Sequence, residues 1–340
     1  MSGEKFDLVA VDETNAVSVG DVFRSIYGDD FPVKDVYDPG TLWREVREGR
    51  VAATLAFDGE GCPVGYISLF KSAPNPRLWE GGNLIVHPAC KYSDLSSILF
   101  RHYLKPENYG PLEADGFFGE AVCHHYFTQV GCVKSGMTDC AVELDLLDGS
   151  SFKDTRAGSG RVACVLNFLE FTRPDAPVHL PERYAEIVQR LSMPLSPRSF
   201  LPADAPLPLN GVTVREDRYH GAARTWKVYV REIGGDWREV VDDLLREAGA
   251  RDVVSLQVTL NTAIPHLGAA VEVLRGRGFF LGGLAPRWFG NDGLLMQKVL
   301  GREPDFDGIK LYSRTAKDLL AFIRMDREET SRLAGGGVSA

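Results

Sequence analysis

The sequence has no uninterrupted apolar run of the roughly 18 residues that a transmembrane helix needs, so it predicts no membrane-spanning segment. Residues 1–13 lack a basic stretch followed by an apolar block, so we expect no signal peptide and a cytoplasmic protein. Positive charge is also scarce, because 38 lysines and arginines face 47 acidic residues and leave a net charge of −9. Nucleic acids and anionic membranes bind basic surfaces, so we expect neither as a partner.

Paired cysteines are missing too. None of the six forms a C-x-x-C motif, and all lie in the first half of the chain, at Cys62, Cys90, Cys123, Cys132, Cys140 and Cys164. Structural zinc sites use closely spaced cysteine and histidine pairs, so we expect no metal. A chain with 44% hydrophobic residues can bury a large core, so a disulfide framework is not needed either. We interpret these cysteines as free thiols that mostly pack in the core.

The length of 340 residues is enough for two domains. A polar, glycine-rich stretch at 150–161 and five prolines between 193 and 208 suggest where the domains are joined. We therefore predict a first domain at 1–150 and a connector at 151–210 with one strand, one helix and a proline-rich segment. A second domain at 211–333 and a flexible tail at 334–340 follow.

Hydrophobic spacing predicts that short strands and helices alternate in both domains. In the first domain we expect helices at 17–27, 95–103 and 126–134, a further helix starting near Pro39, and strands at 6–11, 51–57, 64–70, 82–87, 117–123 and 141–147. In the second we expect strands at 225–233, 253–260, 279–288 and 294–300, and helices at 237–245, 264–274 and 311–325. The fold class is therefore α/β (α+β).

Local motifs sharpen this prediction. In the first half, Leu84-Ile85-Val86-His87-Pro88 precedes a helix, and Gly119-Glu120-Ala121-Val122 is followed by a helix that ends near Gly136. In the second half, a helix closes with Arg277-Gly278-Phe279. This order of elements and motifs resembles the GNAT N-acetyltransferase superfamily. Further segments, such as Ser72–Leu78 and Pro286-Arg287-Trp288-Phe289, resemble a group of bacterial tandem-GNAT proteins whose function is unsettled.

The resemblance implies two tandem GNAT-like domains, each with a mixed, mostly antiparallel sheet flanked by helices. It also implies acetyl-CoA or another acyl-CoA as co-substrate, bound by the first domain. Pantetheine would pair with the backbone of Leu84, Ile85 and Val86. The pyrophosphate would lie on a turn at a helix N-terminus, where backbone N–H groups and the helix dipole favour anions. The corresponding residues are Lys91, Ser93, Leu95, Ser96 and Ser97.

That turn departs from the family pattern, because Tyr92 and Asp94 stand where glycines are common. Glycine lets a backbone approach phosphate closely, so both retained and lost CoA binding remain open. Asp94 is equally suited to cap the helix that starts at Leu95. The family's usual tyrosine acid is also missing, since Val133 occupies its position in the first domain and Arg275 in the second. In the second domain no glycine-rich phosphate loop precedes the first helix, because Gly234-Gly235-Asp236 is short and lacks a basic partner, so we expect that domain to be degenerate.

Acyl transfer to an amine needs a base for the amine and an acid for the leaving thiolate. The best candidates are Glu120, His124 and His125 at the end of a predicted strand. Glu120 could act directly or through water, and His125 could relay protons or merely cap the next helix. Glu80 is a second candidate base, with a solvated loop residue as the alternative. Arg77 could bind a substrate carboxylate or form a surface salt bridge.

Together these features predict an acyl-CoA-dependent N-acyltransferase that transfers an acetyl or related group to an amine of a small molecule or peptide. We expect a monomer or homodimer. The alternative is a catalytically inactive GNAT-fold protein that binds a ligand or regulates a partner.

Overall fold

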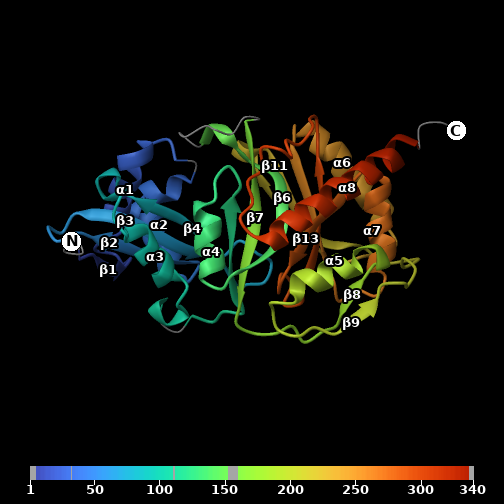
Figure 1. Ribbon diagram of the computed structural model, residues 1–340, viewed down its shortest axis with the longest axis horizontal. Helices are drawn as coiled ribbons and strands as arrows, with labels where there is room; N and C mark the ends of the chain where they lie inside the picture. The colour runs from blue at the N-terminus through green and yellow to red at the C-terminus, as the bar shows by residue number, and fades with distance from the viewer. Residues whose placement is uncertain (1–4, 32, 110–111, 152–159, 337–340) are drawn as a thin grey trace. The chain divides into compact units, whose positions relative to one another are not determined.

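The computed structural model describes residues 5–31, 33–109, 112–151 and 160–336, and the mixed α/β fold is confirmed (Figure 1). The chain divides into two compact units, residues 1–119 and 120–340. The domain boundary that we expect near residue 150 lies within the second unit, and the tandem arrangement stays a prediction. Most of the predicted hinge at 150–161, and residues 337–340 of the predicted tail, lie outside the described residues. No helix within the described ranges is long and apolar enough to cross a membrane.

The first unit is built on a sheet in the order β1-β2-β3-β4-β5. Its strands are β1 (Asp7–Ala10), β2 (Val51–Phe57), β3 (Pro63–Phe70), β4 (Leu78–Val86) and β5 (Gly116–Val122), the last of which ends in the second unit. Strands β1 to β4 are antiparallel, and β5 pairs with β4 in parallel. The helices are α1 (Val17–Tyr27), α2 (Pro39–Arg47) and α3 (Leu95–Tyr103).

The helices of this unit form where the sequence predicts them. On α1, Val19, Val22 and Phe23 repeat with helical spacing and are fully buried against the sheet. Helix α2 begins after Asp38, whose carboxylate accepts hydrogen bonds from the backbone N–H groups of Gly40 and Thr41. These caps and apolar faces explain why the helix predictions here are accurate.

Strand β4 contains a bulge close to the predicted acyl-CoA site. Tyr66 pairs with Ile85 and Ser68 pairs with Gly82, so one residue of β3 faces two residues of β4. At the bulge, Asn83 has a left-handed backbone (φ 55°), and its amide donates to the Ser68 hydroxyl over 3.2 Å. The parallel register between β4 and β5 runs over residues 78–80 and 116–118. The bulge therefore redirects β4 just beyond this parallel segment.

The second unit has strands in the order β7-β6-β13-β14-β12-β11-β10. These are β6 (Thr138–Asp148), β7 (Arg161–Glu170), β10 (Val214–His220), β11 (Thr225–Glu232), β12 (Ser255–Asn261), β13 (Phe280–Ala285) and β14 (Gly293–Val299). Only β11 and β12 pair in parallel among the pairs whose register is known. Strands β8 (Val178–Leu180) and β9 (Phe200–Pro202) form a separate, small parallel pair.

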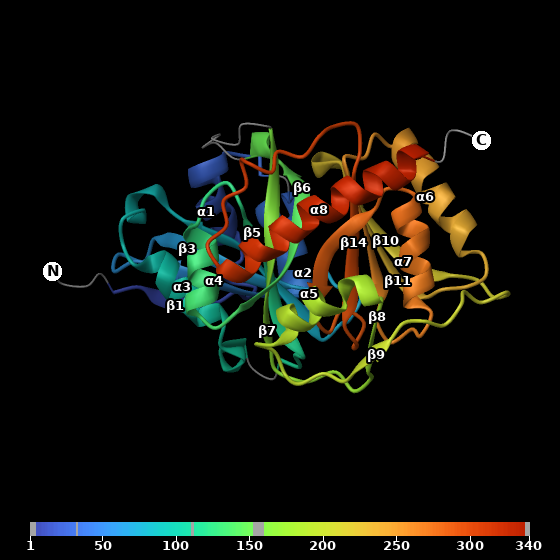
Figure 2. The same ribbon diagram turned by 45° about the vertical axis from the view of Figure 1, so that its right-hand side comes forward.

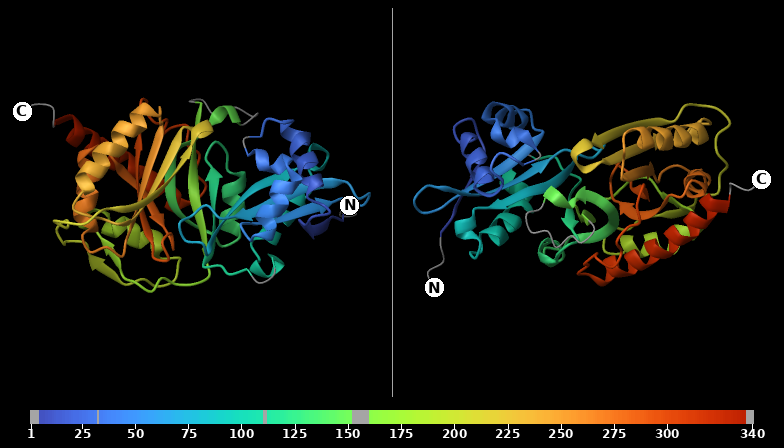
Figure 3. Two further views of the ribbon diagram at one scale, coloured as in Figure 1. Left: turned by 180° about the vertical axis from the view of Figure 1, so that it is seen from behind. Right: turned by 90° about the horizontal axis from the view of Figure 1, so that it is seen from above.

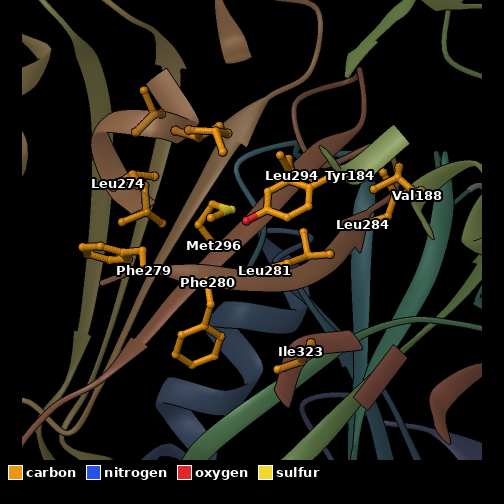
Figure 4. Packing of buried hydrophobic residues seen from close by; sticks show 14 of the residues in the cluster. Tyr184, Val188, Leu274, Phe279, Phe280, Leu281, Leu284, Leu294, Met296 and Ile323 are labelled. Carbon is orange, nitrogen blue, oxygen red and sulfur yellow. The ribbon is translucent and has the colours of Figure 1, made fainter. Parts of the chain in front are cut away.

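Five helices belong to this unit in the described residues: α4 (Phe127–Lys134), α5 (Glu182–Ser192), α6 (Trp237–Ala250), α7 (Leu267–Gly276) and α8 (Arg314–Gly336). Helices α5 and α8 pack on β6 and β13 (Figure 2). Helix α7 packs against α6 and α8 (Figure 3). Between these layers, Tyr184, Phe280 and Met296 belong to one large apolar core (Figure 4).

Side chains of three other strands complete the backbone hydrogen bonding of β6. The Gln297 amide donates to Val142 O (2.9 Å) and accepts from Leu144 N (2.8 Å). The hydroxyl of Ser255 donates to Leu144 O, and that of Thr225 donates to Leu146 O. The polar face of β12 is thus buried against β6. These hydrogen bonds place the middle of β6 close to β11 and β12.

The sequence misses strand β10. Its residues, Val-Arg-Glu-Asp-Arg-Tyr-His, are all exposed and mostly charged, so they carry no hydrophobic alternation. The strand forms because it pairs with β11 along its whole length. Strand β4 also begins four residues before the predicted start at residue 82.

Candidate functional site

The second unit contains two carboxylates that share one ammonium group. Glu120 lies near the end of β5, Glu143 in the middle of β6, and Lys227 on β11. Figure 2 labels these three strands. The Lys227 ammonium forms a short ion pair with Glu120 and lies 3.3 Å from Glu143 Oε1. Three segments that are far apart in sequence therefore meet at one lysine.

These three side chains lie at different depths. Glu120 keeps 16% of its side-chain surface exposed and Lys227 keeps 11%, whereas Glu143 keeps 4%. Burial raises the pKa of Glu143 to about 7, and the nearby charge of Glu120 adds to this rise, while Lys227 opposes it. The innermost carboxyl is therefore poised to hold a proton near neutral pH, and the outer carboxylate remains within reach of solvent.

Four groups next to this cluster are neutral at pH 7. The amide of Gln257, which neighbours Lys227 in the parallel register, favours the ionised form of Glu143. Burial raises the pKa of the Cys123 and Cys164 thiols, so both stay protonated. Burial lowers the pKa of His220, so its imidazole is uncharged.

His124 and His125 follow Glu120 in the turn between β5 and α4. Their rings are in edge-to-face contact, with centroids 4.3 Å apart. Gln129 fixes this turn, since its amide donates to Val122 O, His125 O and Lys310 O. The turn is therefore held rigidly by α4 and by the segment before α8.

Arg77, a predicted substrate-binding residue, forms the salt bridge that we considered as the alternative. Its guanidinium lies 3.0 Å from both Asp115 Oδ1 and Glu113 Oε2. The Asn75 amide also donates to Asp115, over 3.1 Å. These contacts tie the loop before β4 to the residue before β5, so they hold the two strands where their parallel pairing starts. Glu80, the second candidate base, is half-buried and accepts a short hydrogen bond from the Ser72 hydroxyl.

The predicted pantetheine residues differ in their environment. Ile85 is buried in the core of the first unit, so its side chain cannot contact a ligand. Leu84 and Val86, on the other face of β4, are half-buried. Only the backbone of Ile85 is thus compatible with the predicted contact.

The predicted pyrophosphate turn is largely exposed. Lys91, Ser96 and Ser97 are open to solvent. Leu95 is fully buried, where it packs on Gly65, and its backbone N–H donates to the Ser93 hydroxyl over 3.2 Å. The same hydroxyl donates to Cys90 O over 2.8 Å. Ser93 is therefore engaged within the turn, and Asp94 makes no side-chain cap bond to α3.

Sequence reasoning missed Lys227 and Glu143. Each is a charged residue flanked on both sides by apolar residues of a strand, in Trp-Lys-Val and Val-Glu-Leu, and that placement was the available signal. A charge in the middle of a buried strand needs a partner, but the sequence does not show which strands meet. Among the residues that the structure describes, no group of three or more histidine, cysteine or acidic side chains is arranged to hold a metal.

No family model and no curated protein matches the chain. Solved structures do. The chain is similar to GNAT acetyltransferases over about half its length. One is a protein from Acinetobacter baylyi assigned as an acetyltransferase, with 15% identity over 50% of this chain and 94% of that one and a TM-score of 0.40. Another, from Desulfovibrio desulfuricans and assigned to the GNAT family, has 16% identity over 49% of this chain and 99% of that one, with a TM-score of 0.36.

A third similar structure is the spermidine/spermine N-acetyltransferase of Vibrio cholerae, with 10% identity over 49% of this chain and 92% of that one and a TM-score of 0.37. These similarities have low identities and TM-scores, and they carry no information about the substrate.

Proposed function

We propose that the chain is an acyl-CoA-dependent N-acyltransferase with Glu120 as its base. The observation that carries the proposal is the Glu120 carboxylate, which is accessible to solvent, ion-paired with Lys227 and located where the motif resemblance expects the base. A fixed carboxylate of this kind can remove a proton from an ammonium acceptor, either directly or through water.

In the proposed reaction, the acceptor amine loses a proton to Glu120 and attacks the thioester carbonyl. The C–N bond forms, the C–S bond breaks, and the CoA thiolate takes up the second proton, which the new amide nitrogen releases. His125, in the rigid turn after β5, is our proposed polar contact for the acceptor, and His124 packs against it. Glu80 is a further proposed acceptor contact, whereas the pairing of Arg77 favours a structural role.

For the donor, we propose pantetheine contacts with the backbone of Leu84, Ile85 and Val86. The bulge at Asn83 supports this, since it alters the course of β4 beside these residues. The pyrophosphate would contact Lys91 and the N-terminus of α3 near Ser96 and Ser97, where exposed hydroxyls and the helix dipole favour an anion. Ser93 and Leu95 would contribute their backbone or hold the turn.

We also propose that the chain is a tandem of two GNAT-like domains. A recurring order of connections supports this. Parallel strands β4 and β5 flank α3, and α4 then leads to the antiparallel pair β6–β7. Likewise, parallel strands β11 and β12 flank α6, and α7 leads to the antiparallel pair β13–β14. The second domain is degenerate in this proposal, since Arg275 at its tyrosine position is fully buried and ion-paired with Asp326.

One observation favours the second candidate function, an inactive ligand-binding or regulatory protein. The Ser93 hydroxyl is committed to Cys90 and Leu95, and Tyr92 and Asp94 replace the usual glycines. A turn of this kind offers fewer free donors to a pyrophosphate.

The test combines binding and turnover. Titration calorimetry with CoA, acetyl-CoA and longer acyl-CoAs should give binding at one site per chain, and a panel of amines should then reveal transfer. Glu120→Gln should lower turnover while leaving donor affinity unchanged, and Glu216→Gln, in an exposed ion pair with Arg231, is the matched control. If no thioester binds the intact protein, the enzyme proposal fails. Binding without any transfer would favour the inactive alternative.

A further inference from the structure

Lys227 offers one positive charge to two carboxylates. An ammonium has three N–H donors, so it can serve both Glu120 and Glu143, and the structure shows contacts to both. When both carboxyls are ionised, the cluster carries a net charge of −1 in a largely buried position. When Glu143 holds a proton, the charges of Lys227 and Glu120 balance.

Among the described residues, the groups that act electrostatically on Glu143, other than Glu120 and Lys227, are neutral. From β12 comes the neutral amide of Gln257, and from β7 and the end of β5 come the thiols of Cys164 and Cys123, kept protonated by burial. His220 of β10 is neutral because burial lowers its pKa. The protonation of Glu143 therefore sets the charge balance felt by Glu120.

We propose that Lys227 and Glu143 are positioning residues for Glu120. Lys227 fixes the Glu120 carboxylate through their ion pair. Glu143 holds or releases a proton, and this controls how strongly Lys227 pairs with Glu120. This inference rests on the proposed function, because it assigns Glu120 the role of base. With Glu143 protonated, Lys227 pairs fully with Glu120, and the carboxylate is a weak base. With Glu143 ionised, the two carboxylates compete for Lys227, and Glu120 becomes a stronger one.

Two variants separate these roles. Glu143→Gln imitates the protonated state, so it should hold turnover at its low-pH level and remove the rise between pH 6 and 8, a loss of roughly tenfold at pH 8. Lys227→Met removes the fixing charge and should lower turnover at every pH, while Lys227→Arg should restore part of it. Asp145→Asn is the matched control, because Asp145 is another buried carboxyl of β6 but pairs with Arg302 instead.

The decisive experiment has one arm that needs no activity. Carbon-13 NMR of the full chain labelled at glutamate Cδ should show a carboxyl that titrates near pH 7. That signal should vanish in Glu143→Gln, move to higher pH in Lys227→Met, and persist in Asp145→Asn. If no glutamate titrates between pH 6 and 8, or if Lys227→Met leaves the titration unmoved, the inference is overturned.

The second arm measures the pH profile of turnover in the same variants. A profile unchanged in Glu143→Gln also overturns the inference, and the proposed function then survives as long as Glu120→Gln remains impaired. If the wild-type protein transfers no acyl group from any thioester, the proposed function fails. The inference then fails as well, because it assigns Glu120 the role of base, even when the NMR titration is present. The two failures are therefore distinguishable.

Discussion

Two basic side chains of the second unit each lie between two carboxylates, yet they differ in nearly every other respect. Arg198 pairs with Glu170 (2.6 Å) and Asp292 (2.8 Å), and all three side chains are almost fully buried. Lys227 pairs with Glu120 and Glu143, and its outer partner still reaches solvent. The Arg198 cluster is closed to solvent, and the Lys227 cluster is open to solvent on the side of Glu120.

This contrast indicates which cluster is structural. The planar guanidinium of Arg198 satisfies both carboxylates with paired hydrogen bonds, and it joins the proline-rich connector to the end of β7 and to the β13–β14 turn. The ammonium of Lys227 is a single point charge that its two partners must share. A shared charge next to solvent allows a proton to move, so we assign stability to the Arg198 cluster and chemistry to the Lys227 cluster.

The largest expected effect is on the closed cluster. Arg198→Met leaves two buried carboxylates without a counter-charge, so the free energy of unfolding should fall by about 3–5 kcal/mol. Urea denaturation measures this loss. Arg246→Met, at an exposed arginine paired with Asp243, is the control and should cost under about 1 kcal/mol. If both variants lost the same free energy of unfolding, the buried Arg198 cluster would contribute no more to stability than an exposed ion pair, which would contradict its structural role.

The open cluster should respond in activity instead. Glu120→Gln should lower turnover by about 10²-fold or more, because a general base contributes on this scale. The midpoint temperature of thermal unfolding should change little, since the amide keeps the shape of the side chain. The measurement is steady-state acyl transfer alongside thermal unfolding. A variant that unfolds easily but turns over normally would show that Glu120 is structural.

The inner carboxyl should make stability depend on pH. Because the pKa of Glu143 is raised above its unfolded value, its contribution is fully present below about pH 4.5 and is lost as the pH rises to about 7. Relative to wild type, Glu143→Gln should therefore gain of the order of 2 kcal/mol between pH 4.5 and 7. Urea denaturation across this range tests the sign. A constant difference between the two proteins would mean that Glu143 does not titrate there.

The smallest effect concerns the exposed turn at α3. Lys91→Ala should weaken acyl-CoA binding by up to about fivefold, because an exposed charge contributes at most about 1 kcal/mol. Lys105→Ala, just beyond the other end of α3, should leave affinity unchanged. Calorimetry of both variants compares them, and the pyrophosphate assignment fails if they behave alike.

The sequence predicts elements better than it predicts contacts. Helix α1 and the β2–β3 hairpin follow from local spacing and turn residues, and both form as expected. The exposed strand β10 was missed because its pairing with β11, and no local pattern, defines it. For the site, Glu120 was found through a motif, but its link to Lys227 depends on strands more than 100 residues apart. Only the packing of β6 across β11 and β12 brings those charges together.

The role of Glu120 as the base is tested most directly by single-turnover acyl transfer by the wild-type protein and Glu120→Gln at saturating acyl-CoA. Donor affinity is measured by calorimetry on the same samples. We predict donor dissociation constants that agree within about twofold and a transfer rate at least about 10²-fold lower in the variant. Equal transfer rates in the two proteins would contradict the assignment of Glu120 as the base.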